Sequence, residues 1–289
     1  MKRIFIICLA FLPIYLNAQV SENFSDGDFT EAPIWLGTTA NFQVTEAAQL
    51  RLNAPAEAST SYLSTFSDLM NGTTWECWVK MGFNPSANNY SKIYLCSSES
   101  NLTGTLNGYY IKLGGDNSGG DNDDKISLYK QTGTTSVKLI NGITKRIDLS
   151  SVDVFIRVTR DEQGKWKLFT KLKGESAYKL EGSATDNTHT ASQYMGMVCI
   201  YTSSNSTNFY FDNIKVFIDD SAPAFENVEI ASSTSIQINY SKEVDYSEVS
   251  LTLPVSLGAI TSQTPSADER SLLLTFSNPI EAGVIYPIS

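Results

Sequence analysis

The chain has 289 residues, of which 42% are hydrophobic, 18% are charged and 11% are aromatic. This apolar content is sufficient for a packed core and excludes wholesale disorder, and the length allows one large all-β unit or two smaller ones. Asp and Glu number 31 and Lys and Arg 21, which gives a net charge of −10. Because an acidic surface repels phosphates and anionic lipids, we expect no nucleic-acid partner and no membrane-surface binding.

The first 18 residues have the pattern of a secretory signal peptide. Lys2 and Arg3 precede an apolar run over residues 4–16, and Ala18 provides a small residue before Gln19. An apolar run of about 13 residues is too short to cross a hydrocarbon core of about 30 Å. We therefore expect cleavage after Ala18 and a secreted or cell-surface protein with no membrane insertion.

Residues 20–218 consist of short β-branched and aromatic runs separated by clusters of Gly, Asn, Asp and Ser. This texture is typical of antiparallel β-structure, and no long run has helical periodicity. The sequence therefore predicts an all-β jelly-roll sandwich with two sheets packed face to face. The expected strands cover residues 41–45, 49–52, 60–66, 74–81, 91–97, 109–113, 126–131, 137–139, 154–159, 166–172, 178–181, 194–201 and 209–218.

The hairpin over residues 154–172 has the clearest pattern, because Gly164 lies between two alternating runs. Alternation places Trp166 and Leu168 on the face toward the core. The opposite face carries four lysines, Lys165, Lys167, Lys171 and Lys173. Such a stripe can bind an acidic polysaccharide, but charges that alternate with apolar residues are more typical of a solvated sheet face, which is the interpretation we adopt.

The acidic segment 219–223, which contains Pro223, indicates a boundary between a first unit over residues 19–218 and a second over residues 219–289. The second unit has alternating runs that predict four strands, near residues 228–230, 236–240, 249–253 and 272–276. Its roughly 65 residues beyond the linker are few for an Ig-like sandwich of about 100 residues. We therefore expect a smaller, incomplete Ig-like β-sandwich.

Three cysteines follow the leader, Cys77, Cys96 and Cys199. An exported protein can form one disulfide from them. Cys77 and Cys96 lie in consecutive expected strands, and a simple hairpin would place them opposite each other. The alternative is that all three are buried thiols, which is common for cysteine. The sequence leaves both possibilities open.

Residues suited to catalysis are sparse. His189 is the single histidine, so a catalytic triad or a multi-histidine metal centre would have to use it. Paired carboxylates of the kind that retaining glycosidases hold about 5 Å apart occur at Glu243, Asp245 and Glu248, but these lie in the second unit. The sequence therefore disfavours an enzyme.

Residues 116–124 form an acidic loop between two expected strands. Its carboxylates are Asp116, Asp121, Asp123 and Asp124. Oxygen ligands in a loop are what Ca²⁺ prefers, although their spacing here is not that of an EF-hand. The sequence is compatible with a calcium site formed by these four residues and with a solvated acidic loop.

Aromatic side chains beside polar groups are typical of sugar-binding sites. Tyr90 and Tyr109 lie at expected strand ends, and Asn88 and Asn89 precede Tyr90. We therefore predict that these four residues bind a ligand at the lip of the concave sheet. The tryptophans within expected strands are assigned to the core.

Several stretches of the first unit carry a family resemblance. They are Glu22-Asn23-Phe24-Ser25-Asp26-Gly27, Gly108-Tyr109-Tyr110-Ile111-Lys112-Leu113-Gly114, Ile156-Arg157-Val158-Thr159-Arg160 and Phe209-Tyr210-Phe211-Asp212-Asn213-Ile214-Lys215-Val216. Through them, residues 22–217 resemble the concanavalin A-like, laminin-G-like jelly rolls of secreted Bacteroidetes proteins. The resemblance implies a non-catalytic recognition module whose expected partner is a polysaccharide or surface glycan.

The second unit is similar to S-layer-type bacterial Ig-like domains through Ala222-Pro223 and Ile238-Asn239-Tyr240-Ser241-Lys242-Glu243-Val244-Asp245. This resemblance implies a spacer. Lamin-tail domains often follow in such proteins, so we expect the sequence to be a piece of a longer chain. Two alternative functions stay open: an accessory or targeting region of a secreted polysaccharide hydrolase, and a structural adhesin segment that binds protein.

Overall fold

A computed structural model describes residues 20–115, 123–219, 222–246 and 255–281. The chain divides into two compact units, Met1–Ile218 and Asp219–Ser289. The division falls at the start of the acidic segment 219–223. The predicted signal peptide lies outside the described residues and stays a prediction.

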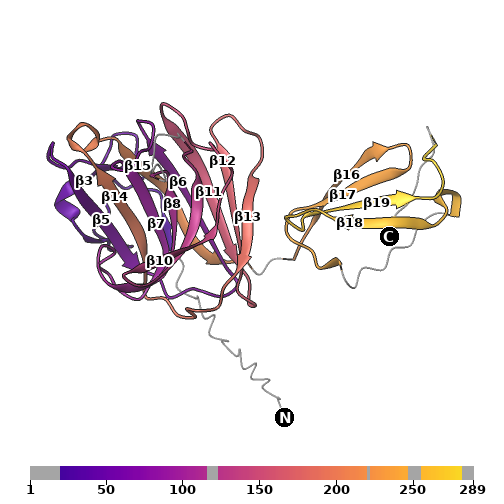
Figure 1. The fold of residues 1–289 in the computed structure, drawn as a ribbon, viewed down its shortest axis with the longest axis horizontal. Coiled ribbons are helices and arrows are strands. Elements are labelled where there is room, and N and C mark those ends of the chain that lie inside the picture. The colour runs from indigo at the N-terminus through magenta and orange to yellow at the C-terminus, as the bar shows by residue number, and fades with distance from the viewer. Residues whose placement is uncertain (1–19, 116–122, 220–221, 247–254, 282–289) are drawn as a thin grey trace, which may run out of the picture. The chain divides into compact units, whose positions relative to one another are not determined.

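The first unit is an antiparallel β-sandwich, as predicted (Figure 1). Its eight-stranded sheet has the order β13-β12-β11-β6-β15-β4-β3, and β1 also pairs with β15. This sheet is built from β1 (Val20–Glu22), β3 (Phe42–Val44), β4 (Leu50–Leu52), β6 (Thr73–Met81), β11 (Val152–Arg160), β12 (Lys165–Leu172), β13 (Lys179–Thr185) and β15 (Phe209–Ile218).

The opposing seven-stranded sheet has the order β10-β9-β8-β7-β14-β5-β2. Its strands are β2 (Leu36–Gly37), β5 (Ser59–Phe66), β7 (Tyr90–Ser97), β8 (Leu106–Leu113), β9 (Ile126–Gly133), β10 (Thr135–Ile140) and β14 (Tyr194–Tyr201). Two single-turn 3₁₀ helices, Thr39–Asn41 and Ser203–Asn205, lie in connections. Every expected strand of this unit is present, and the two short strands β1 and β2 are additional.

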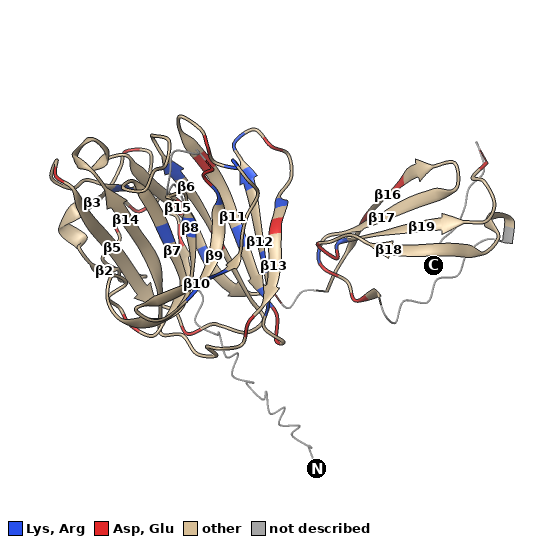
Figure 2. Ribbon diagram, in the orientation of Figure 1, with Lys and Arg blue, Asp and Glu red and all other residues tan. Residues whose placement is uncertain are grey.

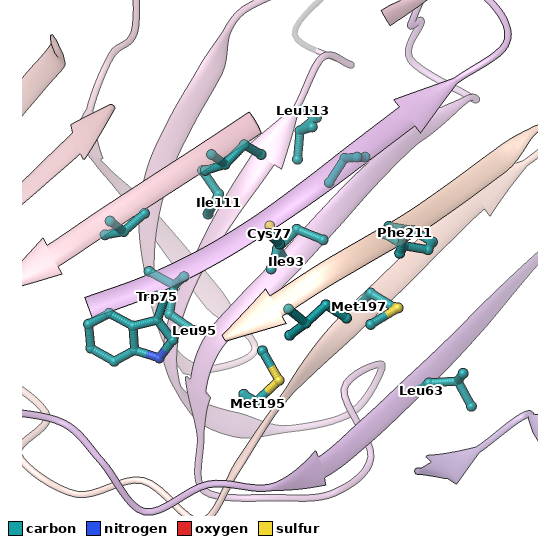
Figure 3. Packing of buried hydrophobic residues seen from close by; sticks show 14 of the residues in the cluster. Leu63, Trp75, Cys77, Ile93, Leu95, Ile111, Leu113, Met195, Met197 and Phe211 are labelled. Carbon is teal, nitrogen blue, oxygen red and sulfur yellow. The ribbon is translucent and has the colours of Figure 1, made fainter. Parts of the chain in front are cut away.

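The core fills the space between the two sheets. Side chains alternate along each strand, so that Trp75 and Cys77 of β6 point inward and meet Ile93 of β7 and Met197 of β14 (Figure 3). Each aliphatic or aromatic side chain buried in this way contributes about 1.5–3 kcal/mol to the stability of the sandwich. The sandwich therefore holds the outer face of each sheet on a rigid scaffold.

The hairpin of β11 and β12 forms in the predicted register, with Arg160 opposite Trp166. Gly164 has a φ of +78°, and a Cβ atom there would lie 1.8 Å from Oδ1 of Asn187. The prediction that the four lysines of this hairpin lie on a solvated sheet face is wrong in part. Lys167 is only 1% exposed, whereas Lys173 is exposed.

The structure also excludes the disulfide between Cys77 and Cys96. The connection from β6 to β7 crosses from one sheet to the other, so these strands do not form a hairpin. Cys77 pairs across β6 and β11 with Ile156, and Cys96 pairs across β7 and β8 with Tyr109. All three described cysteines are free and buried.

The described part of the second unit is a four-stranded antiparallel sheet with the order β16-β17-β19-β18. The strands are β16 (Phe225–Ser232), β17 (Ser235–Tyr240), β18 (Ile260–Pro265) and β19 (Ser271–Phe276), and a 3₁₀ turn covers Val255–Leu257. Ile238, Leu274 and Phe276 are buried in its core. The strand expected at 249–253 lies outside the described residues, and the Ig-like assignment stays a prediction. No described helix is long and apolar enough to cross a membrane.

Candidate functional site

The outer face of the seven-stranded sheet carries an array of tyrosines and lysines. Alternation along β7 turns Ile93 into the core, and Tyr90, Lys92 and Tyr94 therefore point outward. The same alternation brings further outward residues from neighbouring strands onto this face. We call the set the tyrosine–lysine face; it comprises Tyr62, Tyr90, Lys92, Tyr94, Tyr110, Lys112, Tyr129 and Lys138.

Strand register arranges this face in two adjacent rows. The first row runs across five strands, through Tyr62, Val198, Lys92, Lys112 and Ser127. The second row runs across six strands, through Ser64, Gly196, Tyr94, Tyr110, Tyr129 and Lys138. Directly opposed side chains of neighbouring strands lie close enough to interact, so each row is a continuous surface.

The tyrosines of the second row pack against one another. The ring of Tyr110 is 5.0 Å from that of Tyr94 and 5.2 Å from that of Tyr129, with which it is nearly parallel at 3°. The hydroxyl of Tyr94 donates to the side-chain carbonyl of Gln131 at 2.6 Å. These contacts hold the rings in fixed positions.

A loop over residues 98–105 covers one end of the second row. Leu102 lies against Gly196, where a Cβ atom would be 2.8 Å from the leucine side chain. Hydrogen bonds from Ser64 Oγ to the carbonyl of Ser100 and from Gln131 Nε2 to the carbonyl of Gly104 hold the loop in place. The loop leaves a part of the face open, because three rings stay partly exposed, those of Tyr62, Tyr90 and Tyr129.

The lysines of the face lie over its aromatic rings. Nζ of Lys92 is 4.7 Å from the centre of the Tyr110 ring, and Nζ of Lys112 is 4.7 Å from the centre of the Tyr90 ring. Lys112 also donates to the carbonyl oxygen of Gly115 at 2.8 Å. Burial and, second, the charge of Lys112 lower the pKa of Lys92 below its usual value of 10.5.

The structure separates the four residues predicted to bind a ligand. Tyr90 lies on the tyrosine–lysine face, and Asn88 is exposed in the preceding loop. Asn89 is partly buried, and its side-chain carbonyl accepts hydrogen bonds from the backbone and hydroxyl of Thr202 at 2.9 and 3.0 Å. Asn89 therefore links the loop before β7 to the segment that follows β14.

The predicted placement of Tyr109 is corrected. Its side chain is fully buried and packs 4.5 Å from the ring of Trp166 in the core. Its hydroxyl donates to Asp186 at 2.5 Å, and Lys130 binds the other oxygen of that carboxylate at 2.6 Å. Tyr109 and Ile111 are two positions apart on β8, so their side chains point to the same face of the sheet. Because Ile111 points into the core, Tyr109 does so too and does not lie on the outer face.

The predicted calcium residues are only partly described, because Asp116 and Asp121 lie outside the described residues. Asp123 forms an ion pair with Lys125 at 2.6 Å and accepts a hydrogen bond from the backbone of Lys145. Asp124 is buried and accepts from the backbone N–H of Gly115 at 3.2 Å. Within the described part of the chain, no group of three His, Cys, Asp or Glu residues could hold a metal ion.

No family model and no curated protein matches this sequence. Solved structures do resemble it. The carbohydrate recognition domain of Emp46p in its metal-free form matches with a TM-score of 0.52 at 14% identity, over 71% of this chain and 98% of that chain.

The exoplasmic/lumenal domain of VIP36 matches in its metal-free form with a TM-score of 0.51 at 16% identity, over 71% of this chain and 92% of that chain. Its Ca²⁺/Man2-bound form matches with a TM-score of 0.50 at 16% identity, over 71% and 88%. At this level of identity the similarity establishes the fold. The first unit therefore has the β-sandwich fold of these domains.

Proposed function

We propose that the protein is a non-catalytic glycan-binding protein, secreted or held at the cell surface, in which the tyrosine–lysine face binds the sugar and the second unit is a spacer. The observation that carries this proposal is the tyrosine–lysine face, which presents the partly exposed rings of Tyr62, Tyr90 and Tyr129 and places lysine ammonium groups over the last two. The fold that the first unit shares with the carbohydrate recognition domain of Emp46p supports it.

The chemistry of this face suits a sugar. Pyranose rings present C–H groups that pack on the flat faces of aromatic side chains, and a few oriented polar groups then fix the orientation of the sugar. Here the rings supply the flat surface, while the lysine ammonium groups supply hydrogen-bond donors for hydroxyl or acidic oxygens. Because packing within the sheet already orders these side chains, little conformational entropy is lost on binding.

Calcium binding by the acidic loop is a separate proposal. The VIP36 domain of the same fold has been solved in a Ca²⁺/Man2-bound form, which is a reason to test this protein for calcium binding. The two described carboxylates do not form a site by themselves, since Asp123 and Asp124 are held by contacts within the protein. A rise in melting temperature with millimolar Ca²⁺, absent in an Asp121→Ala, Asp123→Ala variant, is the expected result. No shift would refute the site.

A glycan array with the wild type and three variants tests the proposed function. We expect the wild type to bind at least one glycan, and Tyr62→Ala and Tyr129→Ala to weaken that binding about tenfold each, which corresponds to about 1.4 kcal/mol of lost stacking. Tyr210→Ala is the matched control, because Tyr210 lies on β15 of the other sheet and has the cations of Arg51 and Lys80 near its ring.

The outcomes separate the competing functions. Binding that Tyr210→Ala abolishes and Tyr129→Ala leaves intact would move the site to the other sheet and refute the proposal. Release of reducing ends from a bound glycan would favour a polysaccharide hydrolase. A wild type that binds no glycan at all would favour an adhesin segment that recognises protein.

A further inference from the structure

Large apolar side chains are exposed beside the tyrosine–lysine face. Ile34 is 61% exposed, Leu36 45% and Phe66 55%. Ile34 and Leu36 belong to the segment that ends with β2, and Phe66 is the last residue of the neighbouring strand β5. The hydroxyl of Thr65 donates to the carbonyl oxygen of Ile34 at 2.9 Å, which holds this segment against β5. We call Ile34, Leu36 and Phe66 the apolar strip.

Strand register places the apolar strip on the same side of the sheet as the tyrosines. Leu36 of β2 is opposite Ser64 of β5, and opposed residues point to the same face. Because Leu63 faces the core, its neighbour Ser64 points outward, and so does Leu36. Tyr62 and Phe66 are each two positions from Ser64, which makes both of them diagonal neighbours of Leu36. The strip therefore directly continues the tyrosine–lysine face.

Tyr62 joins the two parts of this surface. Its ring lies against Gly37, where an added Cβ atom would be 2.8 Å from the ring carbon Cε2. Gly37 has a φ of +124°, a backbone conformation that favours glycine. The ring of Tyr62 is partly exposed. A ligand that packs on Tyr62 therefore lies beside Leu36, the residue that precedes Gly37.

The two ends of the outer face differ in polarity. Strands β2, β5 and β14 contain no charged residue, and Figure 2 accordingly shows β5 and β14 in tan. On the other side of β14, β7 carries Lys92 and β8 carries Lys112. A ligand that spans this face thus meets ammonium groups at one end and apolar side chains at the other.

The size of the strip indicates which occupant fits it. A stable protein interface takes about 20–30 residues from each partner, far more than this strip supplies. The net charge of −10 disfavours an anionic membrane surface. A few side chains are enough to cover an alkyl chain or an aromatic ring attached to a sugar, and each CH₂ group removed from water strengthens binding about fourfold.

We infer that the glycan carries an apolar substituent, an alkyl chain or an aryl ring, and that Leu36 and Phe66 bind this substituent while Tyr62 packs on the adjoining sugar. This inference rests on the proposed function and names its ligand class, an amphipathic glycoside. Binding would remove the apolar surface of both the strip and the substituent from water, which is favourable.

The test compares glycosides that differ in the apolar group alone. Methyl and octyl β-D-glucoside share one sugar, as do the methyl and octyl forms of α-D-mannoside and of β-D-galactoside. In calorimetric titrations below the concentration at which the octyl forms make micelles, we expect at least one octyl glycoside to bind tenfold or more tightly than its methyl counterpart. Octanol should bind more weakly than that octyl glycoside, because it lacks the sugar.

Variants assign the site. Leu36→Ser and Phe66→Ser should each reduce the advantage of the octyl form at least threefold, and the double variant should bind both forms with the affinity of the methyl form. Leu149→Ser and Phe225→Ser are the matched controls, because these residues are 40% and 62% exposed and lie outside this sheet. They should leave both affinities unchanged. Melting curves verify that each variant is folded.

Failures of the inference and of the proposed function are distinguishable. If the glycan array shows binding and no octyl form is preferred, the inference is wrong and the proposed function stands. If the double variant keeps the preference for the octyl form, the assignment to Leu36 and Phe66 is wrong. Octanol that binds as tightly as the octyl glycoside would also contradict the inference, as would dimerisation of the wild type that the double variant loses. If neither the array nor the glycosides show binding, both proposals fail.

Discussion

Lys92 and Lys112 are direct cross-strand partners on β7 and β8, and each holds its ammonium group 4.7 Å from the centre of a tyrosine ring. The rings attract the two cations, and the cations repel each other. The register of these two strands thus places both lysines and both rings together on the outer face of the seven-stranded sheet.

Removal of the Lys92 charge should stabilise the free protein. We expect Lys92→Met to raise the free energy of unfolding by about 0.5 kcal/mol, because it relieves the repulsion from Lys112 while keeping the apolar stem of the side chain. Urea denaturation measures this change. Lys171→Met, whose cross-strand partner is Phe155, should give no gain. A destabilised Lys92→Met variant would show that Lys92 has a structural role.

The stability difference between wild type and Lys92→Met should depend on pH. The pKa of Lys92 is lowered by burial and by Lys112, so between that pKa and 10.5 the unfolded chain binds more protons than the folded one. Wild-type stability therefore rises relative to the variant as pH increases toward 10.5. Burial raises the pKa of Tyr90 and Tyr94, which keeps these neighbours neutral in that window. A constant difference from pH 7 to 10.5 would contradict this.

Asp186 anchors the loop that follows β13. Burial raises its pKa, but hydrogen bonds from Lys130, Tyr109 and Thr188 outweigh burial and bring the pKa to about 2, below the usual 3.8. The carboxylate thus contributes about 2 kcal/mol above pH 4, and this contribution is lost as the pH falls through 2. Asp186→Asn should lose that stability at pH 6 and match the wild type near pH 1.5 in denaturation experiments. Equal stability at pH 6 would refute the anchor.

The three buried cysteines should behave as inert thiols. Burial raises the pKa of Cys77 and of Cys96 to about 12, and that of Cys199 well above its usual value, so few thiolates form near neutral pH. In a protein that begins at Gln19, we expect three thiols to react with a thiol reagent after denaturation without reductant, and none in the native state. A single reactive thiol after denaturation would indicate a disulfide.

The strands of the sandwich could be predicted because their signals are local. Side-chain alternation and turn residues are read within a few positions, and Gly164 marks its hairpin without reference to the rest of the fold. Strand parity also held the information that would have placed Tyr109 in the core, since Ile111 and Leu113 on the same strand face inward. The short strands β1 and β2 carry too few residues for such a pattern.

The tyrosine–lysine face could not be predicted, because it depends on which strands pair and in what register. Lys92 and Lys112 are 20 positions apart in the sequence, and only the β7–β8 register places them opposite each other. The choice between a Cys77–Cys96 disulfide and free thiols stayed open for the same reason, since local patterns do not reveal which sheet a strand joins. The packing of Leu102 against Gly196 also depends on contacts between segments that are far apart in the sequence.

The most direct test of the glycan-binding face follows the lysines themselves by NMR. Reductive methylation with a ¹³C label keeps the charge of each lysine and gives each one its own signal, assigned through single Lys→Arg variants. Upon titration with a glycan that the protein binds, the signals of Lys92 and Lys112 should shift together and saturate, and that of Lys171 should stay in place. Saturable shifts at Lys171 with Lys92 and Lys112 unmoved would contradict the proposed site.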